Sequence, residues 1–173
     1  MAYFSITKML FFFCIISVMT LISTADDPYE LVNKVCNEEQ NPNFCLGVLK
    51  SDERSKFAKD IKTLTQVAVD VAAKNATATL DYFKGVKTGP PNVLESLKQC
   101  FDPYNNVIVN FQKCMKEEEC DLISYDIHTA GDEVKRCQAF VDGNNAHDSF
   151  ITGSNDMTQN FCLLGESLAN RIC

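Results

Sequence analysis

The sequence predicts an all-α protein: an up-and-down antiparallel four-helix bundle preceded by an N-terminal helical hairpin and stapled by disulfide bonds. Two observations favour this fold class. Apolar residues recur at spacings of three and four over long stretches, which is the periodicity of an amphipathic helix. Strict alternation of apolar and polar residues, which is typical of a strand, does not extend over a useful length. Four long helical segments joined by short loops pack most simply as an antiparallel bundle.

Two short amphipathic segments come first, at residues 29–36 and 44–49. Asn41-Pro42-Asn43 separates them, and the chain is expected to turn there because the residue before a proline is biased away from the helical region. These segments predict the hairpin at about residues 26–53, and the bundle is expected to follow at about residues 55–173.

The first long segment runs from about residue 55 to residue 85. The glycines and prolines at 85 and 89–91 are typical helix stops and end it. Its apolar residues form a single stripe at spacings of three and four, which predicts one buried face. The members of the stripe are Ile61, Leu64, Ala68, Ala72, Ala76, Leu80 and Phe83.

The next segment, at about residues 92–117, contains a proline inside its helical pattern. Pro103 removes one backbone hydrogen bond and crowds the carbonyl of Gln99, so the helix either kinks or begins after it. Because the apolar spacing continues from Cys100 to Phe111, a kinked helix is the preferred expectation. The apolar face carries Val93, Leu97, Cys100, Tyr104, Val107 and Phe111.

Two further helices are predicted at about residues 124–141 and 155–172. Gly143-Asn144-Asn145 stops the first of them, since glycine and asparagine favour helix ends. The seam of the second carries Met157, Phe161, Leu164 and Leu168.

The first 25 residues resemble a secretory signal peptide. Lys8 precedes an apolar run at residues 9–22, and a stretch of small residues ending at Ala25 follows it. A membrane anchor is the alternative, but the run is short for a span and acidic residues follow it at once. We therefore expect cleavage after Ala25, leaving a secreted domain at residues 26–173 that makes no stable insertion into a membrane.

Removal of the leader makes the chain more acidic. The formal charge moves from −7 to −8, because Lys8 is the only charged residue in the leader. This balance argues against nucleic acid or an anionic membrane surface as a partner. It fits a protein that meets a basic surface, although acidity also serves solubility alone.

The leader also contains one of the nine cysteines, so the mature chain retains eight. An even number of cysteines in an oxidising compartment favours disulfides, but the count does not choose a connectivity. A zinc site would need closely spaced cysteine pairs with histidines nearby. The sequence has no Cys-x-x-Cys pair and only His128 and His147, so no metal site is expected.

No pattern of catalytic residues stands out. The sequence has no Gly-x-Ser-x-Gly elbow and no glycine-rich phosphate loop. The acidic run at residues 117–121 is better explained as a solvated loop than as convergent carboxylates, and His128 has no neighbouring nucleophile placed by the sequence. We therefore expect a protein that is not an enzyme and uses no cofactor.

Several strings in order along the chain resemble the plant invertase and pectin methylesterase inhibitor family. They are "CNEEQNPNFC", "LKSDERSKFAKDIKTLTQVAVDVAAKNA", "SLKQCFDPYNNVI" and "TAGDEVKRCQAFVDG". The resemblance covers about residues 29–173 and places the family's helix tyrosine at Tyr104. It implies the helical hairpin and bundle, and it implies a secreted protein that occludes the active-site cleft of an enzyme.

The resemblance also implies two disulfides. Cys36–Cys45 would clamp the hairpin, and Cys100–Cys137 would tie the third segment to the fourth. Short loops closed at a turn bring cysteines within bridging reach, and each such bridge contributes about 2–4 kcal/mol. Cys162 lies where many family members carry an unpaired cysteine.

Three cysteines depart from the family frame: Cys114, Cys120 and Cys173. A Cys114–Cys120 bridge would close only if the helix ends near Glu117, because residues six apart in one helix face different ways. Cys162 and Cys173 would lie about 16 Å apart along an unbroken helix, so they are not expected to pair with each other. One or both would be free, or Cys173 would bridge elsewhere or to a second chain.

The family has two kinds of target, acid invertase and pectin methylesterase. Inhibitors of invertase in this family use a Pro-Lys-Phe element shortly before the last bundle cysteine. This chain reads Cys120-Asp121-Leu122 at that place, whereas its hairpin and "SDERS" region look closer to the invertase branch. The residues proposed to contact the partner are Glu117, Glu118, Glu119, Asp121 and Leu122.

Other readings remain open at this point. A secreted helical carrier of lipids or small ligands, or a family member without inhibitory activity, would share much of this pattern.

Asn75-Ala76-Thr77 is the only glycosylation sequon in the chain, and we expect a glycan on Asn75 if that residue is exposed. The expected location is the extracellular space or cell wall, with the vacuole as an alternative.

Overall fold

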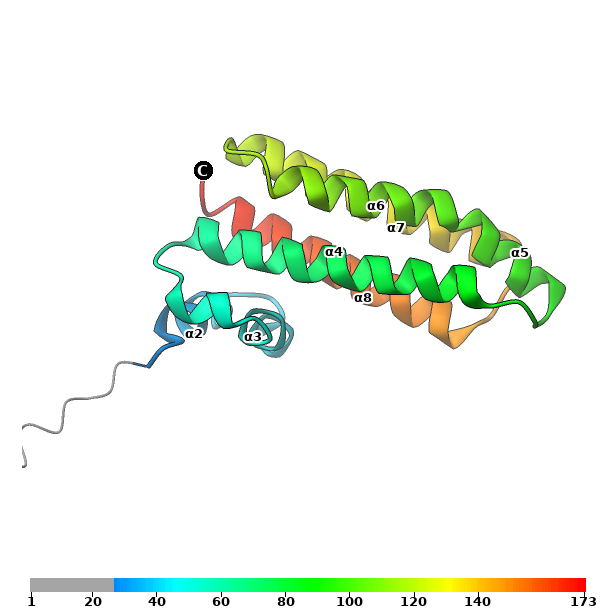
Figure 1. The fold of residues 1–173 in the computed structure, drawn as a ribbon, viewed down its shortest axis with the longest axis horizontal. Coiled ribbons are helices and arrows are strands. Elements are labelled where there is room, and N and C mark those ends of the chain that lie inside the picture. The colour runs from blue at the N-terminus through cyan, green and yellow to red at the C-terminus, as the bar shows by residue number, and fades with distance from the viewer. Residues whose placement is uncertain (1–26) are drawn as a thin grey trace, which may run out of the picture.

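The computed structural model describes residues 27–173, and the predicted leader with its Cys14 lies outside them. All regular secondary structure among the described residues is helical, with no strand among them (Figure 1). The hairpin consists of α2 (Glu30–Cys36) and α3 (Pro42–Lys50). The side chain of Asn41 caps α3 by accepting a hydrogen bond from the amide of Phe44 at 3.1 Å. The break expected around Pro42 is therefore a helix start with proline in its first turn.

The first long helix, α4 (Ile61–Gly85), begins later than the sequence pattern suggested. A short 3₁₀ helix, η1 (Glu53–Phe57), precedes it and connects the hairpin to the bundle. Asp60 determines where α4 begins, because its side chain accepts a hydrogen bond from the amide of Thr63 at 2.8 Å.

The segment with the internal proline is two helices, α5 (Pro91–Gln99) and α6 (Phe101–Cys114), instead of one kinked helix. Pro103 has no amide hydrogen to donate to the carbonyl of Gln99, so the helical ladder is interrupted there. The interruption falls at Cys100, whose φ of −78° and ψ of −10° remain in the helical region. Tyr104 donates its amide hydrogen to the carbonyl of Cys100 at 3.1 Å, so the ladder resumes immediately.

The last two helices are longer toward their N-termini than expected. Helix α7 covers Cys120–Gly143 and α8 covers Ser149–Ala169. Asp148 caps α8 by accepting hydrogen bonds from two backbone amides, at 2.9 and 3.0 Å. The stop around Gly143-Asn144-Asn145 is confirmed, since Asn145 adopts a φ of 48° after the end of α7.

Helices α4, α6, α7 and α8 form the antiparallel bundle (Figure 1). Each helix packs against the next one in the chain, and α8 returns to pack against α4. The hairpin lies beside the bundle at the end where the C-terminus emerges. No helix among residues 27–173 is both long enough and apolar enough to cross a membrane.

Most of the predicted apolar seams are buried in one core. The alanines of α4 allow close packing against large side chains of α6 such as Tyr104 and Phe111. Met157 was expected on the seam of α8, but its side chain is 43% exposed and Thr158 is buried instead. The buried face of α8 is thus rotated by one residue at this point.

Candidate functional site

The acidic segment proposed to contact a partner lies at one end of the bundle. We call residues 117–122 the acidic turn; it contains the connection between α6 and α7 and the first residues of α7. Glu117 is half-buried, and the other proposed contact residues are exposed: Glu118, Glu119, Asp121 and Leu122. The turn therefore presents carboxylates and one apolar side chain to solvent.

Two contacts hold the acidic turn against other parts of the chain. The Nζ atom of Lys62, at the start of α4, lies 3.5 Å from the carbonyl oxygen of Glu118 and donates a weak hydrogen bond to it. A disulfide joins Cys120 to Cys173, with Cα atoms 5.7 Å apart. These contacts limit the conformations of the turn before any partner arrives.

An exposed aromatic residue next to the acidic turn was missed by the sequence reasoning. Tyr125 is 67% exposed, and Leu122, three residues earlier on the same face of α7, is 45% exposed. The neighbouring Ile123 and Ile127 are buried, so the apolar seam of α7 runs on the other side of the helix. This helical offset was available in the sequence and would have identified Tyr125.

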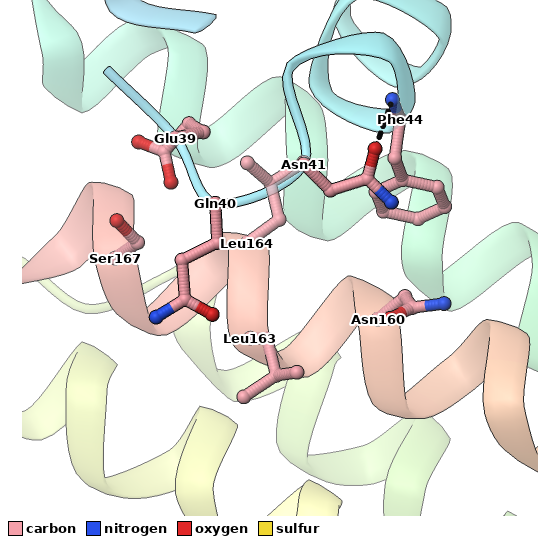
Figure 2. Close-up of a pocket in the computed structure, with 8 residues that line it drawn as sticks. All are labelled: Glu39, Gln40, Asn41, Phe44, Asn160, Leu163, Leu164 and Ser167. Atoms are coloured by element: carbon pink, nitrogen blue, oxygen red, sulfur yellow. Dashed lines mark hydrogen bonds between the residues drawn. The ribbon is translucent and has the colours of Figure 1, made fainter.

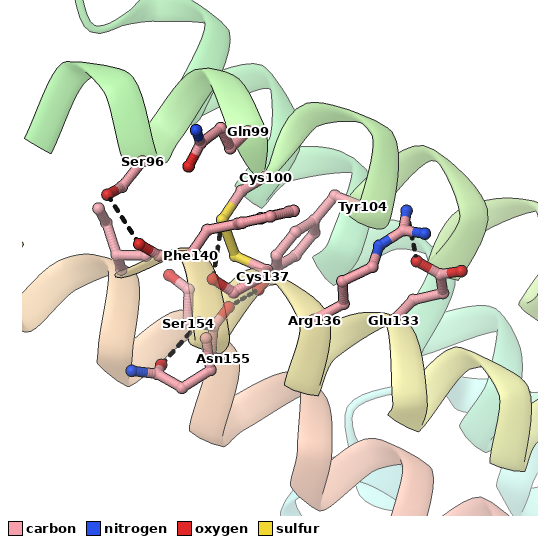
Figure 3. The surroundings of a disulfide bond; sticks show 12 residues. Ser96, Gln99, Cys100, Tyr104, Glu133, Arg136, Cys137, Phe140, Ser154 and Asn155 are labelled. Atoms are coloured by element: carbon pink, nitrogen blue, oxygen red, sulfur yellow. Dashed lines mark hydrogen bonds and ion pairs between the residues drawn. A yellow bond between two sulfur atoms is a disulfide. The ribbon is translucent and has the colours of Figure 1, made fainter. Parts of the chain in front are cut away.

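The structure contains disulfides between Cys36 and Cys45 and between Cys100 and Cys137. Figure 3 shows that the second bridge joins the α5–α6 junction to α7, close to Tyr104. The hydroxyl of Tyr104 donates a 2.9 Å hydrogen bond to Asn155 of α8. Burial raises the pKa of this tyrosine, so its hydroxyl remains a donor.

The Cys114–Cys120 pairing considered above is wrong. Cys114 ends α6 with its side chain in the core, where its thiol donates to the carbonyl of Asn110 at 3.2 Å. Cys120 opens α7 and bonds instead to Cys173, because the chain leaves α8 after Ala169 and turns toward α7. Cys114 and Cys162 are buried and form no disulfide within residues 27–173.

A small pocket lies between the hairpin turn and α8 (Figure 2). Asn41 and Phe44 line it from the hairpin, and Asn160 and Leu163 line it from α8. Its volume of about 140 Å³ is well below the roughly 300–1,000 Å³ of typical ligand sites. The pocket is therefore too small to enclose a lipid.

Asn75, the sequon residue, lies in the middle of α4 and is half-buried. It lines an open groove between α4 and α8, together with Tyr82 and Phe150. The groove is distant from the acidic turn, because Asn75 follows Lys62 by 13 residues, or about 20 Å along the helix.

The fold defines a class: small helical bundles with a docked hairpin, cross-linked by disulfides. The chain belongs to the plant invertase/pectin methylesterase inhibitor family, whose sequence profile matches residues 30–160. The family resemblance inferred from the sequence is confirmed, and the members are inhibitors of enzymes and not enzymes themselves.

One relative is the "Cell wall / vacuolar inhibitor of fructosidase 2" of Arabidopsis thaliana. It is 35% identical over 91 residues, which are 51% of this chain and 50% of the relative. The match thus spans about half the length of that curated relative.

Two solved structures share the fold. One is a mutant form of a pectin methylesterase inhibitor from Arabidopsis, with a TM-score of 0.67, 21% identity, and coverage of 80% of this chain and 95% of that one. The other is a pectin methylesterase inhibitor from Arabidopsis thaliana, with a TM-score of 0.61, 19% identity, and coverage of 83% and 96%. At 21% and 19% sequence identity, the similarity to these two structures shows a shared fold alone.

Proposed function

We propose that the mature chain inhibits an acid invertase, a fructosidase of the cell wall or vacuole, by binding it stoichiometrically. The observation that carries this proposal is the 35% identity to a cell wall/vacuolar inhibitor of fructosidase. The family assignment supports inhibition as the activity. The predicted leader supports a location outside the cytosol.

The proposed contact surface is the acidic turn together with Tyr125. A large aromatic side chain that is exposed beside a rigid turn is typical of an interface hot spot. The carboxylates of Glu118, Glu119 and Asp121 would attract a basic partner surface and speed association. The Cys120–Cys173 bridge lowers the entropy lost on binding, because the turn is already ordered in the free protein.

This surface differs from the family's Pro-Lys-Phe element in charge. Asp121 and Leu122 occupy the corresponding place, so the side chains offered are an acid and an aliphatic group instead of a cation and an aromatic ring. Tyr125, one helical turn later, supplies the aromatic group from α7. We infer that recognition here uses the turn and the first helical turns of α7 jointly.

The deciding experiment is an inhibition titration with the purified, oxidised mature chain. One acid invertase and one pectin methylesterase are assayed in parallel at mildly acidic pH. The proposal expects invertase activity to fall linearly until one equivalent of inhibitor is present. Inhibition of the methylesterase alone would show that pectin methylesterase, and not invertase, is the target. A folded chain that slows neither enzyme would contradict the proposal that this protein is an inhibitor.

Matched variants then test the surface. Tyr125→Ala and Leu122→Ala should each weaken inhibition by about tenfold or more. Val109→Ala is the control, since Val109 is 47% exposed on α6 and lies outside the acidic turn. Equal effects of Leu122→Ala and Val109→Ala would place the contact elsewhere.

A test variant and a matched control examine the role of the negative charge on the acidic turn. Glu118→Gln should slow association and reduce its dependence on salt. Glu95→Gln removes the same charge from α5, at the opposite end of the bundle, and should leave the association rate unchanged (Figure 1).

A further inference from the structure

The groove between α4 and α8 contains an exposed aromatic pair that no other helix covers. The rings of Tyr82 and Phe150 have centroids 3.8 Å apart, and the two side chains are 48% and 43% exposed. Met157 extends the apolar surface and is 43% exposed. Water contact with three large apolar groups in one place is unfavourable, so this surface favours an occupant.

Polar groups line the same groove. Asn75 and Thr79 lie on the α4 side, and Ser149 and Ser154 lie on the α8 side. The groove has a volume of about 510 Å³, which is within the range of about 300–1,000 Å³ for ligand sites. An aromatic platform flanked by amide and hydroxyl groups matches a sugar, whose ring has an apolar C–H face and polar hydroxyls at its rim.

The occupant is suggested by the position of the sequon. Asn75, Thr79 and Tyr82 are spaced at i, i+4 and i+7, so they share one face of α4. The side-chain amide of Asn75 makes no hydrogen bond to any other residue among 27–173 and is available for modification. A sugar attached there would be tethered beside the aromatic pair, and tethering raises its effective concentration at the groove to the millimolar range or above.

We propose that Asn75 carries an N-linked glycan whose inner N-acetylglucosamine units lie in the α4–α8 groove and cover Tyr82 and Phe150. The donor is a lipid-pyrophosphate-linked oligosaccharide of the secretory pathway. The Nδ2 atom of Asn75 forms a bond to C1 of the first sugar, the C1–O bond to the pyrophosphate breaks, and Nδ2 loses one proton to a base. The proposal rests on the predicted leader, since the chain must enter that pathway.

The glycan would cover one part of the protein surface and leave the proposed contact surface accessible. It would cover one face of α4 and α8 and leave the acidic turn free, because about 20 Å of α4 separates Asn75 from Lys62. The groove is thereby assigned to a covalently attached sugar and not to a separate protein partner.

The first measurement is the mass of the peptide containing Asn75, from the full chain with its leader expressed in a eukaryotic secretory host. A mass increase matching a core glycan, abolished by Asn75→Gln, is expected. An unmodified Asn75 in secreted protein would overturn the proposal.

The second measurement asks where the glycan lies. Peroxide should oxidise Met157 several-fold more slowly in the glycosylated protein than in protein whose glycan has been removed enzymatically. The glycosylated protein should also unfold at a higher temperature, and Phe150→Ser should abolish most of that difference. If oxidation and unfolding are insensitive to the glycan, the sugar projects into solvent and the groove assignment fails.

Discussion

Arg171 holds the hairpin against the bundle through Glu38: its Nη2 atom lies 2.7 Å from a carboxylate oxygen of that residue. The Nη1 atom of Arg171 also donates to the carbonyl of Val35 at 3.3 Å and to Glu39 at 3.4 Å. One guanidinium from the C-terminal turn thus contacts both the end of α2 and the loop that follows it. Together with the edge-on contact of Phe44 and Phe161, it fixes how the hairpin sits.

Replacement of Arg171 by alanine should loosen the hairpin without unfolding the bundle. The side chain of Glu39 is only 6% exposed, so the substitution leaves a nearly buried carboxylate without its cation. We expect a loss of about 1.5–3 kcal/mol in the free energy of unfolding, the scale of hydrogen bonds to charged groups. Hydrogen exchange should accelerate in α2 and α3 more than in α6.

Lys135→Ala is the matched control for that variant. Lys135 pairs with Asp132 at 2.9 Å within a single helix, three residues apart, and the two side chains are 62% and 56% exposed. Its removal should change stability by less than about 0.5 kcal/mol. Faster exchange of the hairpin in both variants would show that Arg171 has no special role there.

Mild reduction should open the Cys120–Cys173 bridge before the other two. Cys173 is exposed and Cys120 is half-buried, whereas the four cysteines of the other bridges have no exposed surface. Because thiol–disulfide exchange needs direct access of a thiolate to sulfur, the accessible bridge reacts first. Alkylation after brief treatment with a dithiol, followed by peptide mass analysis, should label Cys120 and Cys173 first, and early labelling of Cys36 would contradict this expectation.

The two unpaired thiols should be inert in the folded mature protein. Burial raises the pKa of Cys114 to about 12 and also raises the pKa of Cys162, so almost no thiolate exists at neutral pH. A thiol reagent that gives a coloured product should therefore detect no reactive cysteine before denaturant is added and two after it. Rapid reaction under native conditions would show that these side chains become accessible through local opening.

The cysteines also show where sequence reasoning was sufficient and where it was not. The helix seams were predicted because burial of apolar residues follows the helical period directly. The partner of Cys173 could not be predicted, because it depends on the turn after Ala169 and on the packing of α8 beside α7. The Cys114–Cys120 alternative failed for a different reason: Cys114 continues the buried seam of Val107 and Phe111 and therefore faces the core, which the apolar spacing already indicated.

The starts of the helices depend on capping side chains, which do not contribute to the periodic pattern of apolar residues. Asp60 and Asp148 cap their helices, and both could have been recognised as acidic residues just before apolar runs. Exposure of Met157 was not predictable, because it follows from how α8 rotates against α4. The proposed contact surface was only partly predicted: the acidic turn was identified, and Tyr125 was not.

Asp52 should make the protein sensitive to acid. The side chain of Arg54 donates hydrogen bonds to this carboxylate and holds its pKa at about 2, below the ordinary value of 3.8. The folded-state pKa is depressed, so the stabilising contribution is present above the unfolded value and is lost as the pH falls through the folded value. Wild-type stability should therefore decrease between about pH 4 and pH 2 partly through this group.

Asp52→Asn tests that expectation by chemical denaturation across the same pH range. The variant should be less stable than the wild type above pH 4, and the difference should shrink toward pH 2, because the protonated carboxyl no longer pairs with Arg54. Asp81→Asn removes an exposed carboxylate outside the Arg54 cluster and is the control. A stability difference that stays constant from pH 5 to pH 2 would mean that Asp52 acts through its shape and not through its charge.

Gly165 allows α8 to approach α7, and its replacement by alanine should destabilise the bundle. A Cβ atom at this position would lie 3.1 Å from Cδ1 of Ile127, whose side chain is fully buried and has little room to move. We expect a loss of about 1–3 kcal/mol, the usual cost of overpacking a core. Gly153→Ala on the same helix meets no atom within 4 Å, so it should stabilise the helix by about 0.5–1 kcal/mol. Adding Ile127→Val to Gly165→Ala should recover part of the lost stability. A double variant that is no more stable than the sum of the two single losses predicts would show that the strain does not come from the contact with Ile127.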